Sequence, residues 1–128
     1  MGQWYVVDLR IKPLKNRENN LCEALLKYLE GFNGRTRKEV KPEELEKLDG
    51  KERLEALLDI IYPDLEDLGM LSDGKKLYES SFDASYSWET VICDVFCLMA
   101  PYLRSGSSMT VWPDSGKYTL KVRKGQVA

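Results

Sequence analysis

The sequence predicts an α+β domain: a four-stranded mixed sheet with helices packed on it and a C-terminal β-hairpin. Residues 4–12 alternate between apolar and polar side chains, as a half-buried strand does. Residues 17–32 and 88–103 instead carry apolar side chains at helical spacing. Residues 107–123 hold two short alternating runs around a turn. We expect the order β-α-α-α-β-α-β-β in a single domain spanning residues 1–128, since this length is typical of one domain.

The first strand has an apolar face and a mixed face. Tyr5, Val7, Leu9 and Ile11 share one side, which we expect to face the core. Pro13 ends the strand because proline lacks the N–H that a sheet ladder needs.

A helix is predicted over 17–32. The acidic stretch 41–68 is predicted to be mainly helical, in two segments. Pro42 suits the first turn of a helix, and the glutamates after it favour a helix N-terminus. The run 49–52 (Asp-Gly-Lys-Glu) has the form of a capping box that opens a second helix, which Pro63 stops. We expect residues 64–71 to form a single turn and a loop.

The last third of the chain predicts a strand over 76–86, a buried helix over 88–103 and the hairpin around 113–116. If the strands before and after the helix are parallel neighbours, the three elements form a βαβ unit. Pro101 should disturb the last turn of the helix. Residues 124–128 are expected to be a turn and a ragged end.

Composition excludes several classes of protein. The chain is 43% hydrophobic and 10% aromatic, too apolar for a disordered protein. It has 3 Cys, which is an odd number for a secreted disulfide scaffold, and no His, the commonest general base and metal ligand. We expect no cofactor, no signal peptide and no membrane segment, and therefore a cytoplasmic location.

Two groups of residues invite a chemical interpretation. Cys93 and Cys97 are spaced i, i+4, but a thiolate zinc site needs four ligands, so we expect both thiols to pack in the core. Glu79 and Asp83 share a strand face, and with Asp8 or Asp114 they suggest a small metal-dependent enzyme. We treat that enzyme as a second alternative, because the recognisable order of a catalytic motif is missing.

Charge is strongly segregated along the chain. Residues 43–67 hold 3 basic and 10 acidic side chains, whereas residues 101–128 hold 5 basic and 1 acidic. We therefore expect a small, non-catalytic binding or inhibitor-type protein whose acidic helical surface engages a basic protein partner. The candidate partner-binding residues are Glu43, Glu44, Glu46, Asp59, Asp64 and Glu66.

In general appearance, rather than through any motif, the chain resembles bacterial and phage accessory proteins such as immunity proteins and inhibitors of defence nucleases. Two further partners stay open. A second copy of the chain is one, with the kinked helix end around Met99, Pro101 and Tyr102 as the contact. Nucleic acid is the other, bound on a basic sheet face. The residues of that alternative face are Arg10, Lys12, Arg35, Arg37, Lys117, Lys121 and Arg123.

Overall fold

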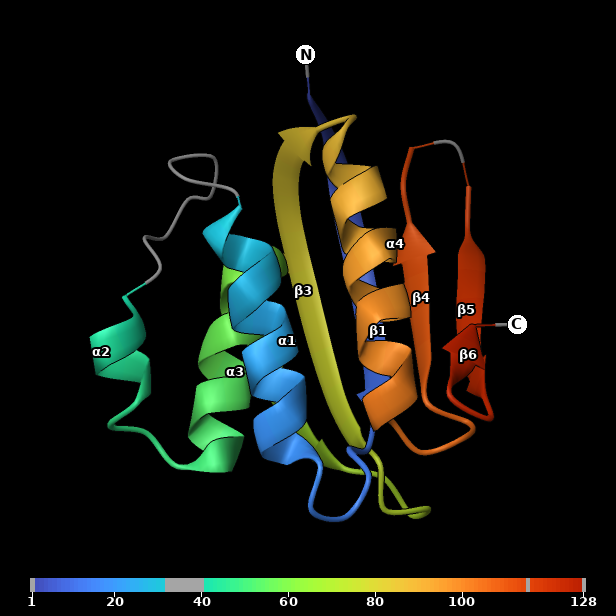
Figure 1. Ribbon diagram of the computed structural model, residues 1–128. Helices are drawn as coiled ribbons and strands as arrows, with labels where there is room; N and C mark the ends of the chain where they lie inside the picture. The colour runs from blue at the N-terminus through green and yellow to red at the C-terminus, as the bar shows by residue number, and fades with distance from the viewer. Residues whose placement is uncertain (1, 32–40, 115, 128) are drawn as a thin grey trace.

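The centre of the molecule is a six-stranded sheet in which every neighbouring pair is antiparallel. The computed structural model describes residues 2–31, 41–114 and 116–127. The strands lie side by side in the order β2-β3-β1-β4-β5-β6 (Figure 1). Their bounds are β1 Gly2–Ile11, β2 Glu66–Met70, β3 Lys76–Ser85, β4 Ser108–Trp112, β5 Tyr118–Arg123 and β6 Gln126–Val127.

The long helices cover one face of this sheet and leave the other open (Figure 1). In the described residues, α1 (Glu18–Glu30), α3 (Gly50–Ile61) and α4 (Trp88–Met99) form this layer, and α4 continues into a 3₁₀ turn over Ala100–Tyr102. The four-residue α2 (Pro42–Leu45) lies at the outer side of α3.

The alternation of β1 determines which side of the sheet is buried. Tyr5, Val7, Leu9 and Ile11 are at most 1% exposed beneath the helices, as their spacing predicted. Trp4, on the opposite face, is 54% exposed. Since β1 pairs with β3 on one side and β4 on the other, it fixes the orientation of both neighbours.

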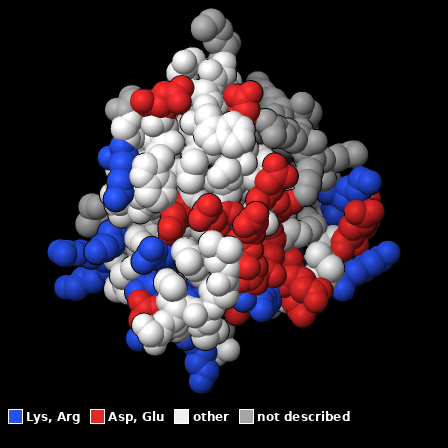
Figure 2. Space-filling model, turned by 180° about the vertical axis from the view of Figure 1, so that it is seen from behind, with Lys and Arg blue, Asp and Glu red and all other residues white. Residues whose placement is uncertain are grey.

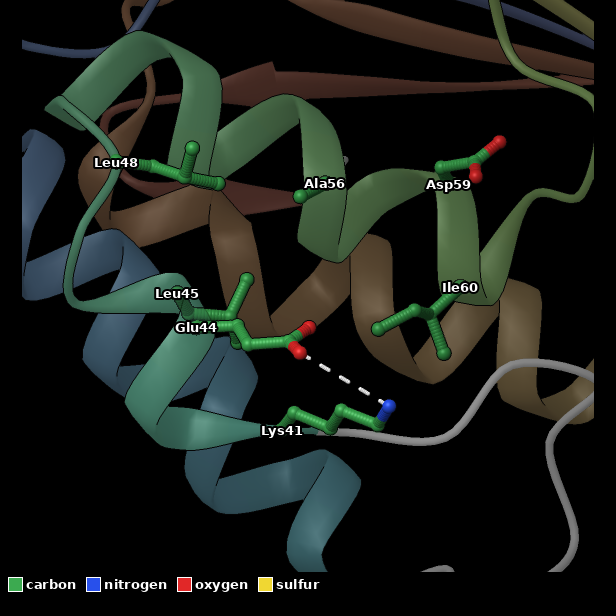
Figure 3. A pocket seen from close by; sticks show the side chains of 7 residues that line it. All are labelled: Lys41, Glu44, Leu45, Leu48, Ala56, Asp59 and Ile60. Atoms are coloured by element: carbon green, nitrogen blue, oxygen red, sulfur yellow. Dashed lines mark ion pairs between the residues drawn. The ribbon is translucent and has the colours of Figure 1, made fainter.

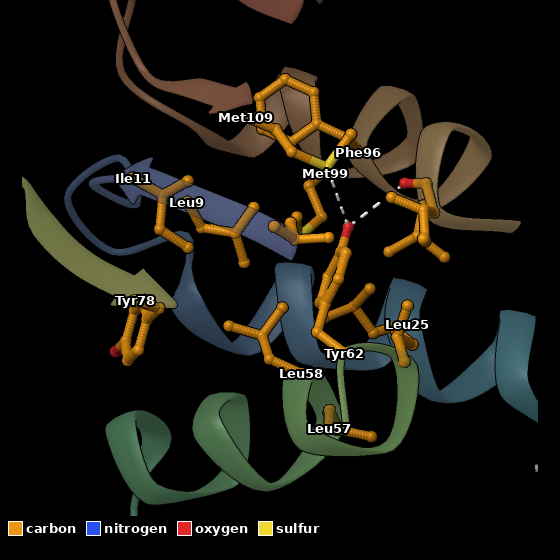
Figure 4. Close-up of a cluster of buried hydrophobic side chains, with 14 of the residues drawn as sticks. Leu9, Ile11, Leu25, Leu57, Leu58, Tyr62, Tyr78, Phe96, Met99 and Met109 are labelled. Carbon is orange, nitrogen blue, oxygen red and sulfur yellow. Dashed lines mark hydrogen bonds between the residues drawn. The ribbon is translucent and has the colours of Figure 1, made fainter. Parts of the chain in front are cut away.

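A buried tyrosine joins the helices to the sheet. Tyr62, directly after α3, is completely buried, and its hydroxyl donates to the carbonyl of Ile92 in α4 at 3.2 Å. The same hydroxyl lies 3.5 Å from the sulfur of Met109 in β4 (Figure 4). Burial raises the pKa of Tyr62 well above its usual value, so the hydroxyl remains a donor.

The prediction of a four-stranded sheet is wrong, because two more strands flank it. β2 forms where a turn and loop were expected, and β6 forms in the expected ragged end. Four of the five β2 residues are exposed, and a bulge between Asp67 and Gly69 breaks the register. A short, bulged edge strand has no apolar alternation, so its sequence carries no period-two signal.

The prediction of a mixed sheet with a parallel βαβ unit is also wrong. β3 and β4 run in the same direction, but β1 lies between them and is antiparallel to both. Helix α4 therefore connects two strands that are not neighbours. Sequence order suggested adjacency, whereas the long N-terminal strand occupies the central position.

Several local predictions are confirmed. Asp49 caps α3, with its carboxylate accepting from the N–H of Glu52 at 2.8 Å. Pro101 lies in the 3₁₀ turn that ends α4, and the hairpin of β4 and β5 forms as expected. Met99, expected near a self-association surface, is instead fully buried in the core of its own chain.

The Tyr62→Phe substitution should lower the free energy of unfolding by about 1 kcal/mol, the typical net value of one buried hydrogen bond. The ring would still fill its site, so the denaturant dependence of that free energy should not change. Urea denaturation followed by circular dichroism measures both quantities. Tyr86→Phe is the matched control, since Tyr86 is 55% exposed, and it should have almost no effect. Equal stability of Tyr62→Phe and the unmodified protein would contradict a stabilising role for this hydroxyl.

Candidate functional site

The short helix α2 presents three of the acidic residues that the sequence singled out. Glu43 and Glu44 lie in its first turn, where the helix dipole favours negative charge, and Glu46 follows its last residue. All three are exposed. A helix this short does not persist alone in water, so tertiary contacts must hold it.

Arg53 of α3 provides one of those contacts. Its guanidinium donates to the carbonyls of Leu45, Glu46 and Leu48 at 3.0, 3.3 and 3.1 Å. The carbonyls of Glu46 and Leu48 follow the end of α2, and the carbonyl of Leu45 also accepts from the N–H of Leu48 at 3.1 Å. The side chain of Leu45 is buried, which anchors the helix from its inner side. Arg53 and Leu45 therefore hold the glutamates of α2 at a fixed position beside α3.

A groove of about 330 Å³ runs between α2 and α3 (Figure 3). Its apolar lining comes from Leu45, Leu48, Ala56 and Ile60. Glu44 borders it on the α2 side, and Asp59 lines it from α3 with its carboxylate turned away from Glu44 (Figure 3). The groove thus combines an apolar lining with a carboxylate on each helix.

Glu44 at the rim of the groove is only weakly engaged by Lys41. Lys41 Nζ lies 3.9 Å from Glu44 Oε1, and the two side chains are 49% and 67% exposed. An exposed pair of this kind contributes roughly 0–1 kcal/mol. Asp59 accepts a hydrogen bond from the N–H of Leu65 at 3.1 Å, which orients its carboxylate. A competing cation can displace Lys41 from Glu44 at little cost.

A second hollow of about 270 Å³ continues from Asp59 towards the β2 edge of the sheet. There Tyr78 donates to Glu55 at 2.9 Å, and burial raises the pKa of this tyrosine. A hydrogen bond from Lys76, whose Nζ lies 2.9 Å from the Asp67 carboxylate, lowers the pKa of Asp67. Acidic groups therefore extend from α2 across α3 to the sheet edge.

The remaining predicted partner-binding residues lie elsewhere. Asp64 is exposed in the connection after α3, with a positive φ of 58°. Glu66 opens β2 and pairs in register with Glu79, on the face that the helices do not cover. The predicted acidic set is thus divided between the helix layer and the open sheet face.

Three carboxylates form a row across that open face. Asp8 of β1 is the register partner of Glu79 of β3, and Glu79 is the partner of Glu66 of β2. Figure 2 shows acidic side chains gathered across the middle of this face. Asp8 also pairs with Arg10 at 3.2 Å. Like charges directly opposite one another destabilise a sheet, so this row carries an internal energetic cost.

The alternative basic residues lie mainly on the other half of the same face. Lys117, Lys121 and Arg123 project from β5 or its preceding turn, and Lys117 lies 5.5 Å from the ring centre of Trp112. Lys12 follows the end of β1, with its ammonium beside Gly74. Arg35 and Arg37 fall outside the described residues. The strand order, which places β1 between β3 and β4, could not be read from the sequence, so the juxtaposition of acidic and basic halves was not predicted.

The carboxylates considered for metal chemistry are spread out. Glu79 and Asp83 share a face of β3 but are separated by about 13 Å along the strand, too far to share one ion. Asp114 lies in the turn after β4, where its N–H donates to Gln3 at 3.1 Å. Within the described part of the chain, no three residues of the types His, Cys, Asp and Glu are grouped to hold a metal ion.

The three cysteines are free thiols in different surroundings. Burial raises the pKa of Cys22 to about 11. Cys93 is half-buried beside Tyr118, whose hydroxyl donates to Glu89 at 2.7 Å, so the thiol is the donor in its 3.3 Å contact with that hydroxyl. Burial raises the pKa of Cys93 too. Cys97 is exposed, so the expectation that it packs in the core is wrong: it lies on the outer side of α4.

Comparison with protein-family models, with curated proteins and with solved structures found no match to this chain. Among the helices in the described ranges, none is both long enough and apolar enough to cross a membrane.

Cys97 should react first with a soluble thiol reagent. In the folded protein at about pH 8 we expect one rapid reaction, because the other two thiols are shielded and have raised pKa values. Unfolding should expose all three thiols. Reaction with a chromogenic disulfide reagent measures the number of reactive thiols and the rate at which each one reacts. The Cys97→Ser substitution should remove the fast phase. A fast phase that survives in this variant would contradict the exposure pattern.

The Glu79→Gln substitution should stabilise the protein by about 0.2–1 kcal/mol, because it removes the central charge of the carboxylate row. Thermal denaturation at low salt measures the change, and added salt should shrink it by screening. Asp94→Asn, an exposed carboxylate on α4, is the matched control. A lower stability of Glu79→Gln than of the unmodified protein would show that the row is favourable in the isolated chain.

Proposed function

We propose that this chain is a non-catalytic binding protein that engages a basic segment of a partner protein in the groove between α2 and α3. The observation that carries the proposal is the combination of an apolar lining with carboxylates on both helices. Lysine and arginine side chains match it, because their aliphatic stems pack on apolar surface while their charged ends reach acidic groups.

The two parts of the groove make different contributions. Apolar contact with Leu48, Ala56 and Ile60 supplies affinity through burial. Glu44 and Asp59, together with the neighbouring glutamates of α2, attract a basic segment from a distance and orient it. Association should therefore be faster at low salt.

The chemistry of the surface favours an inhibitor or immunity-type role. The target that fits best is a protein that binds nucleic acid, because such a protein carries a basic surface. The exposed glutamates of the groove would compete with the phosphate backbone for the cations of that surface. Free thiols are typical of a reducing compartment, which supports a cytoplasmic location for this activity.

Nucleic acid itself is a weaker candidate ligand. Lys117, Lys121 and Arg123 offer cations, but the row of Asp8, Glu79 and Glu66 lies on the same face. A phosphate backbone crossing that face would meet carboxylates within a few strands of the cations, at a spacing of about 4.8 Å per strand.

A lysine-rich amphipathic peptide should bind the groove and shift the backbone amide signals of α2 and of residues 56–60. Titration of the ¹⁵N-labelled protein followed by NMR locates the site and gives the dissociation constant. Glu44→Gln should weaken binding by roughly threefold to tenfold, the range expected for loss of one charged contact.

Two controls separate this site from general attraction to a negative protein. Asp94→Asn removes one negative charge from α4 and should leave the affinity unchanged. A peptide of the same apolar pattern with glutamate in place of lysine should not bind. Shifts confined to other surfaces, or equal weakening by Glu44→Gln and Asp94→Asn, would overturn the proposal.

A further inference from the structure

Among the described residues, no helix covers the face of the sheet opposite α1, α3 and α4, and aromatic residues lie on it. Trp4 of β1 is 54% exposed and Trp112 of β4 is 37% exposed. Val6, between Trp4 and Asp8 on the same side of β1, pairs in register with Trp112. This patch of apolar surface lies on the two central strands of the sheet.

Charge divides this face into two halves, separated by a line that runs parallel to the strands. The acidic half lies on β1, β3 and β2, and the basic half lies mainly on β5, with Arg10 beside Asp8 on the central strand. Basic side chains flank the acidic row on the β5 side in Figure 2. The acidic half comprises Asp8, Glu66, Glu79 and Asp83, with Arg10 paired to Asp8, and the basic half comprises Lys117, Lys121 and Arg123.

Such a pattern is complementary to itself. A two-fold axis that lies in the face and runs between β1 and β4 turns one copy over, so that β1 faces β4 of the other copy and β3 faces its β5. Glu79 of β3 then lies opposite the stretch of β5 between Lys117 and Lys121, twice per dimer, as an isologous interface requires. Trp4 and Val6 of β1 then face β4 of the second copy, which carries Trp112.

We propose that two copies of this chain associate face to face through the open sheet face. The contact goes beyond the proposed function, because the groove between α2 and α3 lies in the helix layer on the other side of the sheet. A partner with a single sign of charge would be repelled by half of this face, whereas a second copy matches both halves.

The available area predicts a weak dimer. Six strands and the ten residues of β1 define at most roughly 800 Å², the area that each partner of a standard interface buries. The outer strands are shorter, and the face is polar apart from its central patch. We therefore expect a dissociation constant in the micromolar range that rises with salt.

Charge-swapped variants test the arrangement directly. Variant A carries Glu66→Lys and Glu79→Lys, and variant B carries Lys117→Glu and Lys121→Glu. In either variant alone both symmetry-related contacts bring like charges together, so self-association should weaken at least about tenfold. In a mixture of the two, the substituted lysines of variant A meet the substituted glutamates of variant B, which restores one contact with its signs reversed. The second contact joins the unmodified basic half of variant A to the unmodified acidic half of variant B. The mixture should therefore form a heterodimer about as stable as the original dimer.

Sedimentation equilibrium at about 10–300 μM protein, in low and high salt, measures the dissociation constant of the dimer. The four samples are the unmodified protein, variant A, variant B and the mixture of A and B. Asp94→Lys and Lys27→Glu, which reverse charges in the helix layer, are the matched controls and should dimerise as the unmodified protein does. Heterodimer formation also shows that both variants are folded.

A monomeric unmodified protein throughout this range at low salt would overturn the proposal. So would dimers that survive in variants A and B, since these would use another surface. Variants that are monomeric both alone and in mixture, with native circular dichroism, would equally rule out the two-fold arrangement. None of these results affects peptide binding in the groove.

Discussion

One-sided burial of the central strand is the constraint on which the rest of the structure depends. β1 pairs with β3 along its whole length and with β4 over residues 6–10, while its inner side chains are almost fully buried. A shift of one residue would turn Trp4, Asp8 and Arg10 into the core and Tyr5 and Val7 into water. The hydrophobic side of β1 therefore fixes the register of its neighbours, and with it the polar pattern of the open face.

The sequence predicts this burial well because the signal is local. The alternation of residues 4–12 and the cap at Asp49 each act over a few residues, and both are confirmed. The position of β2 was not predictable, since Glu66, Asp67, Leu68 and Met70 are all exposed and give no periodic pattern. The acidic row was missed for a related reason. Asp8, Glu79 and Glu66 are far apart in the chain, and only pairing across three strands brings them together.

The net charge of −2 conceals a strongly polar distribution of charge. Acidic groups extend from α2 over α3 to the β2 edge and onto the sheet, while cations gather on β5. Within one copy, the distance across the sheet and solvent screening limit the attraction between these regions. Repulsion within the row of Asp8, Glu79 and Glu66 raises the free energy of the isolated chain. Cations of a partner that contact this row would reduce the repulsion.

The two proposed surfaces are compatible because they lie on opposite sides of the sheet. A dimer formed through the open face would leave both α2–α3 grooves at its outer surfaces, where each remains accessible. A dimer with two grooves could bind a partner that has two basic segments. Once the first segment is bound, the effective concentration of the second segment at the other groove would be high. The weak attachment of Lys41 to Glu44 and the modest size of each groove would then matter less, since two such contacts act together. Self-association would in this way convert a small, weak site into a more selective one, without any change in the groove itself.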